Sequence, residues 1–235
     1  MGNVENVNVV GRAEWLAARK ELLTAEKDFT QLCDDLARQR RNMPWVRVEK
    51  DYVFDGPNGP QHLGDLFEGR SQLIVYHFMF APDAQAGCKS CSFWADHFDA
   101  TIPHLNARDV TFVAVSRAPR AKLEAQARRL GWRFKWLSCG DGDFNYDFRV
   151  SFDPSRAPAE YNYASFKGTN LDMPGFSTFI KGADGAIYHT YSTFGRGIEM
   201  ANATYNLLDI APKGRNEEGL PYVMSWVRFH DEYGT

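Results

Sequence analysis

The sequence predicts an α/β protein with a central mixed sheet flanked by helices, and three observations support this prediction. Apolar, β-branched segments at 72–80 and 110–115 have the length of buried strands. A stretch of helical character follows each of them, so strands and helices alternate as in a parallel core. Farther along, alternating segments at 176–181 and 186–191 flank a glycine-containing turn at 182–185 and predict a β-hairpin.

A long helix is predicted near the start of the chain, from Arg12 to Asn42, because this stretch contains no glycine or proline. Its apolar side chains recur every seven residues, at Trp15, Leu22, Phe29 and Leu36. Such a stripe packs on the protein's own domain or on the same helix of a second subunit, so a homodimer through this helix is one expectation. Cys33, near the edge of the stripe, is expected to be a buried, inert thiol. Pro44 ends the helix, and residues 1–44 form an N-terminal helical arm.

The other expected elements follow in chain order, between breaks made by glycine and proline. They are a strand at 46–54, a turn at 55–60, a short helix at 63–67, a helix from the cysteine motif to about residue 100, a helix at 120–130, a short strand at 132–137 and a last helix at 198–208. An aromatic-rich stretch at about 140–175 is too apolar for a linker and is expected to fold over one face as an insertion. These elements define one domain, 45–211, followed by a C-terminal tail, 212–235.

Composition and charge narrow the possible functions. The chain has 235 residues, of which 44% are hydrophobic, and this is enough to bury one substantial core. A net charge of −3 gives no reason to expect nucleic acid, and no segment approaches the roughly 20 apolar residues that span a bilayer. The first residues, Met1 to Asn6, lack the basic start and apolar core of a secretory signal. We therefore expect a cytoplasmic protein whose partner is a small molecule or another protein, with no nucleic acid and no membrane.

Two cysteines, Cys88 and Cys91, stand at CxxC spacing after the first buried strand. A CxxC that follows a strand and opens a helix is typical of thiol redox proteins. Free backbone N–H groups and the positive end of the helix dipole favour thiolate over thiol at the first turn. Cys88 is therefore the predicted nucleophile and Cys91 the resolving cysteine, and Lys89 adds a small favourable charge.

Other chemistries are open to a pair of cysteines. Structural zinc needs two more ligands, yet Cys33 and Cys139 stand alone in the sequence. Haem attachment needs a histidine directly after the second cysteine, where this chain has Ser92. A copper chaperone is an alternative, because two thiolates and a histidine suit copper(I), and His189 or His77 could supply the third ligand. A binding module with inert cysteines is another alternative. Our prediction includes no metal and no cofactor.

His77 lies near the end of the strand that leads to the cysteines. An imidazole titrates near neutral pH and is suited to accept the proton of the resolving thiol. We therefore include His77 in the predicted site with Cys88 and Cys91. A core histidine bonded to a backbone carbonyl is the competing interpretation. His97 lies six residues beyond Cys91, between one and two helical turns, so its spacing does not direct it toward the thiols.

Several longer motifs carry a family resemblance. They are Tyr76–Phe80, Gly87–His97, Gly131–Phe134, Asp143–Asp147 and Thr190–Ser192. Together they resemble a bacterial thioredoxin-like family known as domain of unknown function number eight-nine-nine, over most of the chain. The order βαβα followed by ββα resembles the thioredoxin superfamily as a whole. This resemblance implies a thioredoxin-like fold and a dithiol that exchanges with the disulfide of a protein or small molecule, while an external thiol reductant closes the cycle.

The loop before Cys88 also resembles that of peroxiredoxins, which reduce peroxides at an N-terminal cysteine. That family places a proline and a threonine seven and three residues before its reactive cysteine, where this chain has Ala81 and Gln85. Peroxide reduction is therefore the alternative function. Thioredoxins place a cis-proline before the strand that faces the cysteines, and the matching position here is near Ser177, three residues after Pro174.

Overall fold

The computed structural model describes residues 8–169 and 171–234 and divides into two compact units after Pro44. Residues 1–6, in which the sequence shows no features of a secretory signal, lie outside the described residues. The first unit contains the predicted long helix, α1 (Arg12–Arg41), and none of the helix residues is buried. Cys33 is exposed on α1, so the prediction of a buried thiol is wrong for this unit.

The second unit is built on a mixed sheet, as predicted. Across the sheet, the described strands are β1 (Val46–Arg47), β10 (Ile187–Phe194), β9 (Gly175–Lys181), β4 (Gln72–His77), β5 (Val110–Ser116), β6 (Lys135–Ser138), β2 (Val53–Gly56) and β3 (Gly59–His62). β4, β5 and β6 run parallel, and β9 pairs antiparallel with β4. The hairpin of β9 and β10 is the one that the sequence predicts. The expected strand at 46–54 is divided between β1 and β2, which lie near opposite edges of the sheet.

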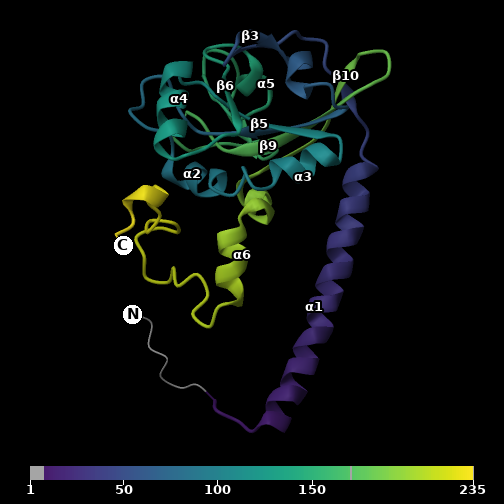
Figure 1. Cartoon of the computed structure of the whole chain (residues 1–235), viewed down its shortest axis with the longest axis vertical. Helices are drawn as coiled ribbons and strands as arrows, with labels where there is room; N and C mark the ends of the chain where they lie inside the picture. The colour runs from purple at the N-terminus through teal and green to yellow at the C-terminus, as the bar shows by residue number, and fades with distance from the viewer. Residues whose placement is uncertain (1–7, 170, 235) are drawn as a thin grey trace. The chain divides into compact units, whose positions relative to one another are not determined.

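Helices cover both faces of this sheet (Figure 1). The described helical and minor elements are η1 (Leu63–Phe67), α2 (Lys89–Ala95), α3 (Ile102–Ala107), α4 (Arg120–Arg129), α5 (Phe144–Asp147), β7 (Glu160–Tyr161), β8 (Ala164–Ser165), η2 (Gly195–Ala201), α6 (Ala203–Ile210) and η3 (His230–Glu232). α2 and α3 lie on one side of the sheet and α5 on the other. The expected last helix is split because Asn202 caps α6, its side chain accepting the N–H of Tyr205. None of the described helices is long and apolar enough to cross a membrane.

The alternation of side chains along β4 creates two separate cores. Leu73 and Val75 pack against η1 and α5 on one face. Ile74 and Tyr76 pack on the other face, against α2 and the strongly aromatic core beneath it. Because successive strand residues point to opposite faces, His77 belongs to the first face and its neighbour Tyr76 to the second. This division decides which residues reach the cysteines.

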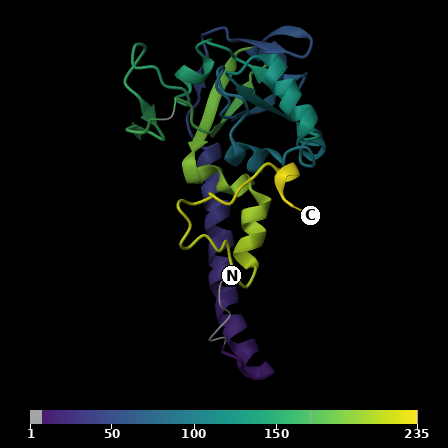
Figure 2. The ribbon, with the colours of Figure 1, turned by 90° about the vertical axis from the view of Figure 1, so that its left-hand side faces the viewer.

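The aromatic-rich insertion at about 140–175 is folded, and Figure 2 shows its teal-green loop projecting from the domain. An ion pair that is almost fully buried anchors its described part to the end of β5. The guanidinium of Arg117 donates to both carboxylate oxygens of Asp172, at 2.8 and 3.2 Å. Ser151 donates a further hydrogen bond to Asp172, at 2.6 Å. The charge of Asp172 is thereby compensated away from water.

The segment from residue 212 onward, predicted as a tail, belongs to the second unit. Val227 and Phe229 are buried in the core that contains Tyr76. Near its end, Asp231 accepts two hydrogen bonds from Arg129 of α4, at 2.7 and 2.9 Å. The segment therefore packs against α4 and the aromatic core beneath α2.

Candidate functional site

Cys88 is positioned by a tight loop between β4 and α2, and it forms the N-cap of α2. The preceding Gly87 is buried, and a Cβ at this position would lie 2.7 Å from the ring of Phe78. The N–H of Gly87 donates to the side-chain oxygen of Gln126 on α4, at 2.6 Å. The N–H of Cys88 donates to the carbonyl of Met79, at 3.0 Å. Glycine is needed here for space, and these bonds fix where the thiol emerges.

The surroundings of Cys88 stabilise its thiolate. Its pKa is lowered to about 6, first by the hydrogen bond from the thiol of Cys91. The backbone N–H groups of Cys91 and Ser90 and the hydroxyl of Ser90 add to this lowering, against the opposing effect of burial. These are the donors expected where a thiolate sits at the start of a helix. Cys88 is partly buried as a residue, and at a pKa of about 6 its thiol is largely ionised at neutral pH.

Cys91 differs from Cys88 in both its burial and the direction of its pKa shift. It is buried, with 2% of its surface exposed, and burial raises the pKa of its thiol well above the ordinary value. The N–H of Met79 points at its sulfur, at 3.5 Å. Both thiols are free in this structure. The pair therefore combines one ionised sulfur with one protonated sulfur that donates to it, which is the arrangement of a nucleophile and a resolving thiol.

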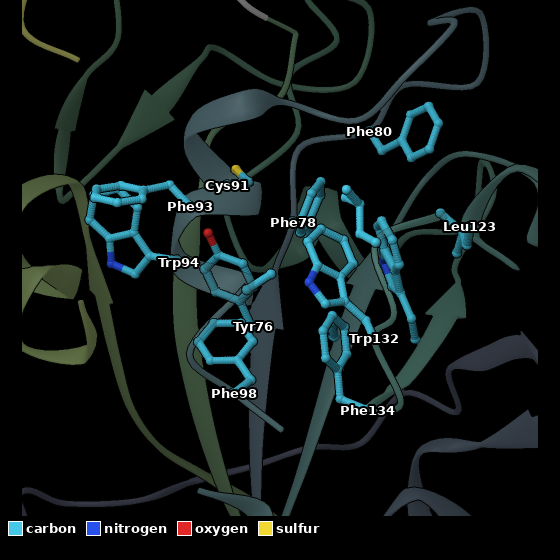
Figure 3. Close-up of a cluster of buried hydrophobic side chains, with 14 of the residues drawn as sticks. Tyr76, Phe78, Phe80, Cys91, Phe93, Trp94, Phe98, Leu123, Trp132 and Phe134 are labelled. Carbon is cyan, nitrogen blue, oxygen red and sulfur yellow. The ribbon is translucent and has the colours of Figure 1, made fainter. Parts of the chain in front are cut away.

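Tyr76 is a further site residue that the sequence interpretation missed. It is fully buried, and Figure 3 shows its hydroxyl directed toward Cys91 of α2. Burial raises the pKa of this hydroxyl well above its ordinary value, so it remains a neutral donor. It has no hydrogen-bond partner of normal geometry among the described residues. The alternation Leu73, Val75, His77 in the sequence would have placed Tyr76 on the cysteine face of β4.

The structure does not bring His77 to the cysteines. It faces the other core, where it stacks on Phe144, and the side-chain oxygen of Asn145 lies 3.0 Å from its Nδ1. Its Nε2 lies 2.9 Å from the hydroxyl of Ser177. Burial lowers its pKa to about 4, so His77 is neutral at physiological pH. The predicted role as proton acceptor for Cys91 has no support in this geometry, and His77 is a core histidine bonded to side chains.

The other histidines discussed above also lie away from the thiols. His189 of β10 contacts Phe148 in the core of His77, and its Nε2 bonds to Ser192 at 2.8 Å. His97 bonds to Thr204 at the start of α6. Within the described residues, no three histidine, cysteine, aspartate or glutamate side chains are grouped closely enough to hold a metal ion. The copper alternative would therefore require a rearrangement.

Lys89 and Cys139 take no part in activating Cys88. The ammonium of Lys89 pairs with Glu232 of the C-terminal segment, at 3.1 Å, and lies over the ring of Phe229. Its charge is thereby directed away from the sulfur. Cys139 is buried at the end of β6, and burial raises the pKa of its thiol to about 12.

The residue before β9 differs from the sequence expectation. The strand begins at Gly175, so Pro174 immediately precedes it and Ser177 lies inside it. The residue directly before this strand, where thioredoxins place their proline, is therefore Pro174. Its peptide bond is trans, as are the other peptide bonds of the described residues. Alternation of side chains alone does not locate the start of a strand to within a few residues, so the sequence does not show that Pro174 directly precedes β9.

The fold and the site together define the class of this protein: a thioredoxin-like α/β protein with an asymmetric CxxC dithiol at the start of its first central helix. Within that class, the chain belongs to the family described as bacterial protein of unknown function (DUF899), which matches residues 4–233. This match confirms the family resemblance drawn from the motifs. No curated protein matches the chain.

The solved structures similar to this one include peroxiredoxins. Peroxidoxin BcpB from Mycobacterium tuberculosis is 17% identical, with 69% of this chain and 95% of that chain covered and a TM-score of 0.46. A mutant of peroxiredoxin Q from Xanthomonas campestris is 14% identical, with 72% and 98% covered and a TM-score of 0.49. A mitochondrial 2-Cys peroxiredoxin from Plasmodium falciparum is 12% identical, with 70% and 92% covered and a TM-score of 0.42. At these identities, activity does not carry over to this chain.

Proposed function

We propose that this protein is a thiol–disulfide oxidoreductase in which Cys88 is the nucleophile and Cys91 the resolving cysteine. The Cys88 thiolate attacks a substrate disulfide, forms a mixed disulfide and releases the first substrate thiolate. Cys91 then attacks the Cys88 sulfur and releases the second thiolate, while its proton passes to a released thiolate. The protein loses two electrons and the substrate gains two. An external thiol reductant returns the Cys88–Cys91 disulfide to the dithiol.

One observation carries this proposal: Cys88 is the partly buried N-cap of α2, Cys91 is buried within the first turn of the same helix, and the pKa values of the two thiols are shifted in opposite directions. Cys88 has a pKa of about 6, whereas the pKa of Cys91 is raised well above its ordinary value. A pair of inert core thiols has no reason to be arranged in this way, because burial alone raises the pKa of each thiol. Cys139, which is buried alone, shows that ordinary effect.

The test is the loss of thiols after the reduced full chain is mixed with bis(2-hydroxyethyl) disulfide, an uncharged reagent. The chain has four cysteines, and we expect the two of the motif to be oxidised to a disulfide. Cys91→Ser should stop at the mixed disulfide, which mass spectrometry detects on Cys88. Cys88→Ser should abolish the reaction, and Cys33→Ser, on exposed α1, is the matched control that should retain it.

Retention of full activity by Cys88→Ser would refute the proposal. Rapid consumption of a hydroperoxide that depends on Cys88 and needs no Cys91, without reduction of the disulfide, would identify a peroxide reductase instead. Stoichiometric binding of copper(I) that is lost in His189→Ala would identify a copper-binding protein. The reduction potential of the Cys88–Cys91 pair then decides whether the protein acts as reductant or oxidant.

A further inference from the structure

A cavity of about 780 Å³ adjoins the cysteine motif. It lies between α2, the start of β9, η2 and the segment that follows α6. Most of its wall is apolar, and the side chains that form this wall are Met79, Trp94, Pro174, Ile198, Val223 and Met224. The volume is within the range of small-molecule sites, roughly 300–1,000 Å³. The cavity is therefore sized for a small molecule that reaches the motif.

The charged side chains that line this cavity are engaged with one another. Arg215 pairs with Asp209 at 2.7 Å and with Glu199 at 3.3 Å, and Arg196 pairs with Glu199 at 2.9 Å. Because each guanidinium already has a carboxylate partner, a charged ligand would have to displace an existing ion pair.

The remaining charged group, Glu217, is also occupied. One of its carboxylate oxygens accepts from the hydroxyl of Tyr205 and from the indole N–H of Trp226, each at 2.7 Å. The same oxygen accepts the N–H of Met224, at 3.2 Å. These contacts hold the wall of the cavity together, and since none of these three donors is a cation, the charge of Glu217 disfavours an anionic occupant.

The end of the cavity at α2 carries the reactive groups. Ser90 and Cys91 line it, and these are the two side chains that donate hydrogen bonds to the sulfur of Cys88. Tyr76 lines it too, with a fully buried hydroxyl that is directed toward Cys91 and has no hydrogen bond of normal geometry among the described residues (Figure 3). A sulfur atom held at this end would lie beside Ser90 and Cys91 and within reach of this hydroxyl.

We propose that this cavity binds one half of a small, uncharged, apolar disulfide, with its sulfur–sulfur bond beside Ser90 and Cys91. This inference rests on the proposed function and names its substrate class. Cys88 attacks one sulfur and forms the bond Cys88–S–S–R, while the bond R–S–S–R breaks and RS⁻ departs. Attack by Cys91 on Cys88 then releases the second RS⁻, and the proton of Cys91 and one from solvent complete two RSH. Tyr76 donates to the sulfur in the cavity.

The test compares two disulfides of the same carbon skeleton with the reduced full chain. Dipropyl disulfide is apolar, and 3,3′-dithiodipropionate carries a carboxylate in place of each terminal methyl. Each rate constant is divided by that of the same disulfide with free 2-mercaptoethanol, which removes the difference in intrinsic reactivity. We expect the corrected rate for dipropyl disulfide to be about tenfold higher or more, because a carboxylate in this cavity has no free cation.

A substitution in the wall provides the second comparison. Val223→Lys places an ammonium at a cavity position that is already 65% exposed in the chain, so the fold should tolerate it. Because it supplies a cation for the carboxylate of the charged disulfide, it should lower the corrected ratio of the two disulfides at least about fivefold. Leu207→Lys, at an exposed position of α6 outside the cavity, is the matched control and should leave the ratio unchanged.

The outcomes separate this inference from the function on which it rests. Equal corrected rates for the two disulfides, or a ratio that Val223→Lys leaves intact in a folded protein, would overturn the cavity assignment and preserve the oxidoreductase. Failure of both disulfides to react would overturn both. In Cys88→Ser, saturable quenching of tryptophan fluorescence by dipropyl disulfide, and none by the dicarboxylate, would support the site independently of turnover.

Discussion

Cys88 and Cys91 are three residues apart in the sequence but differ in every property that governs thiol chemistry. Cys88 is partly exposed and receives hydrogen bonds, whereas Cys91 is buried and gives one. A thiolate that accepts several donors has a low pKa, and a buried thiol surrounded by apolar groups has a high one. The opposite pKa shifts of the two thiols are therefore set by their positions on the first turn of α2.

The reactivity of Cys88 should follow a titration with a midpoint of about pH 6. Because its folded pKa is below the ordinary value, the reactive thiolate is present above this pH and is lost as pH falls through it. The measurement is the rate at which iodoacetamide alkylates Cys88, quantified by mass spectrometry across the pH range. Cys91→Ala should move the midpoint upward, because it removes the donor with the largest effect. Cys33→Ala should not move it, and a midpoint near 9 in the unaltered chain would contradict the prediction.

At the scale of the element, β4 shows what the sequence could and could not predict. The apolar segment at 72–80, the CxxC after it and the hairpin at 176–191 were all recoverable, because strand length, alternation and turn residues are local signals. The face of β4 that carries the site was also encoded locally, in the alternation of Leu73, Val75 and His77. His77 is suited by its chemistry to accept a proton but lies on the other face, and the side chain that β4 presents to Cys91 is Tyr76, a neutral donor.

The wall of the cavity could not be predicted in the same way. Its residues come from η2 and from the irregular segment around Met224, whose sequences carry no periodic pattern. Their positions depend on contacts distant in sequence, such as the bond from the indole N–H of Trp94 to the carbonyl of Ile198, at 2.9 Å. The division of the last helix at Asn202 was missed for another reason. The side chain of Asn202 caps α6, and the apolar periodicity of 198–208 does not reveal such a cap.

The burial of His77 on the far face of β4 has a measurable consequence for stability. Its folded pKa is about 4, below the ordinary value of 6.5, so the unfolded chain binds a proton that the folded chain does not. The contribution of His77 to the free energy of unfolding is therefore constant above pH 6.5 and decreases as pH drops from 6.5 toward 4. The total decrease from this group is about 3 kcal/mol. The measurement is the free energy of unfolding in urea at a series of pH values in this interval.

His77→Gln should remove that part of the pH dependence, so its curve and the curve of the unaltered chain should converge as pH falls. His104→Gln, which replaces an exposed histidine on α3, is the matched control and should keep the original slope. Parallel curves for the unaltered chain and His77→Gln would show that His77 does not bind its proton differently in the folded state.

At the scale of the whole molecule, α1 forms a unit separate from the domain that carries the cysteines. It has 30 residues, which corresponds to a length of about 45 Å, and none of them is buried. The stripe that the sequence predicts is exposed, with Leu22 at 56% and Phe29 at 67%. We propose that two copies of α1 pair along this stripe and form a homodimer, because a helix of this length with an a/d-like pattern gains stability chiefly by burying that pattern.

Sedimentation equilibrium of the full chain should then give twice the mass of one chain. Leu22→Glu combined with Phe29→Glu should give a monomer, because two carboxylates on each helix would face apolar side chains of the partner. Thr24→Glu combined with Gln31→Glu adds the same charge at exposed positions off the stripe and should leave the dimer intact. The cysteine site lies wholly in residues 45–234, so we expect the monomeric variant to retain disulfide reduction at an unchanged rate per chain. A monomer in the unaltered chain, or equal association of both double variants, would exclude pairing through α1.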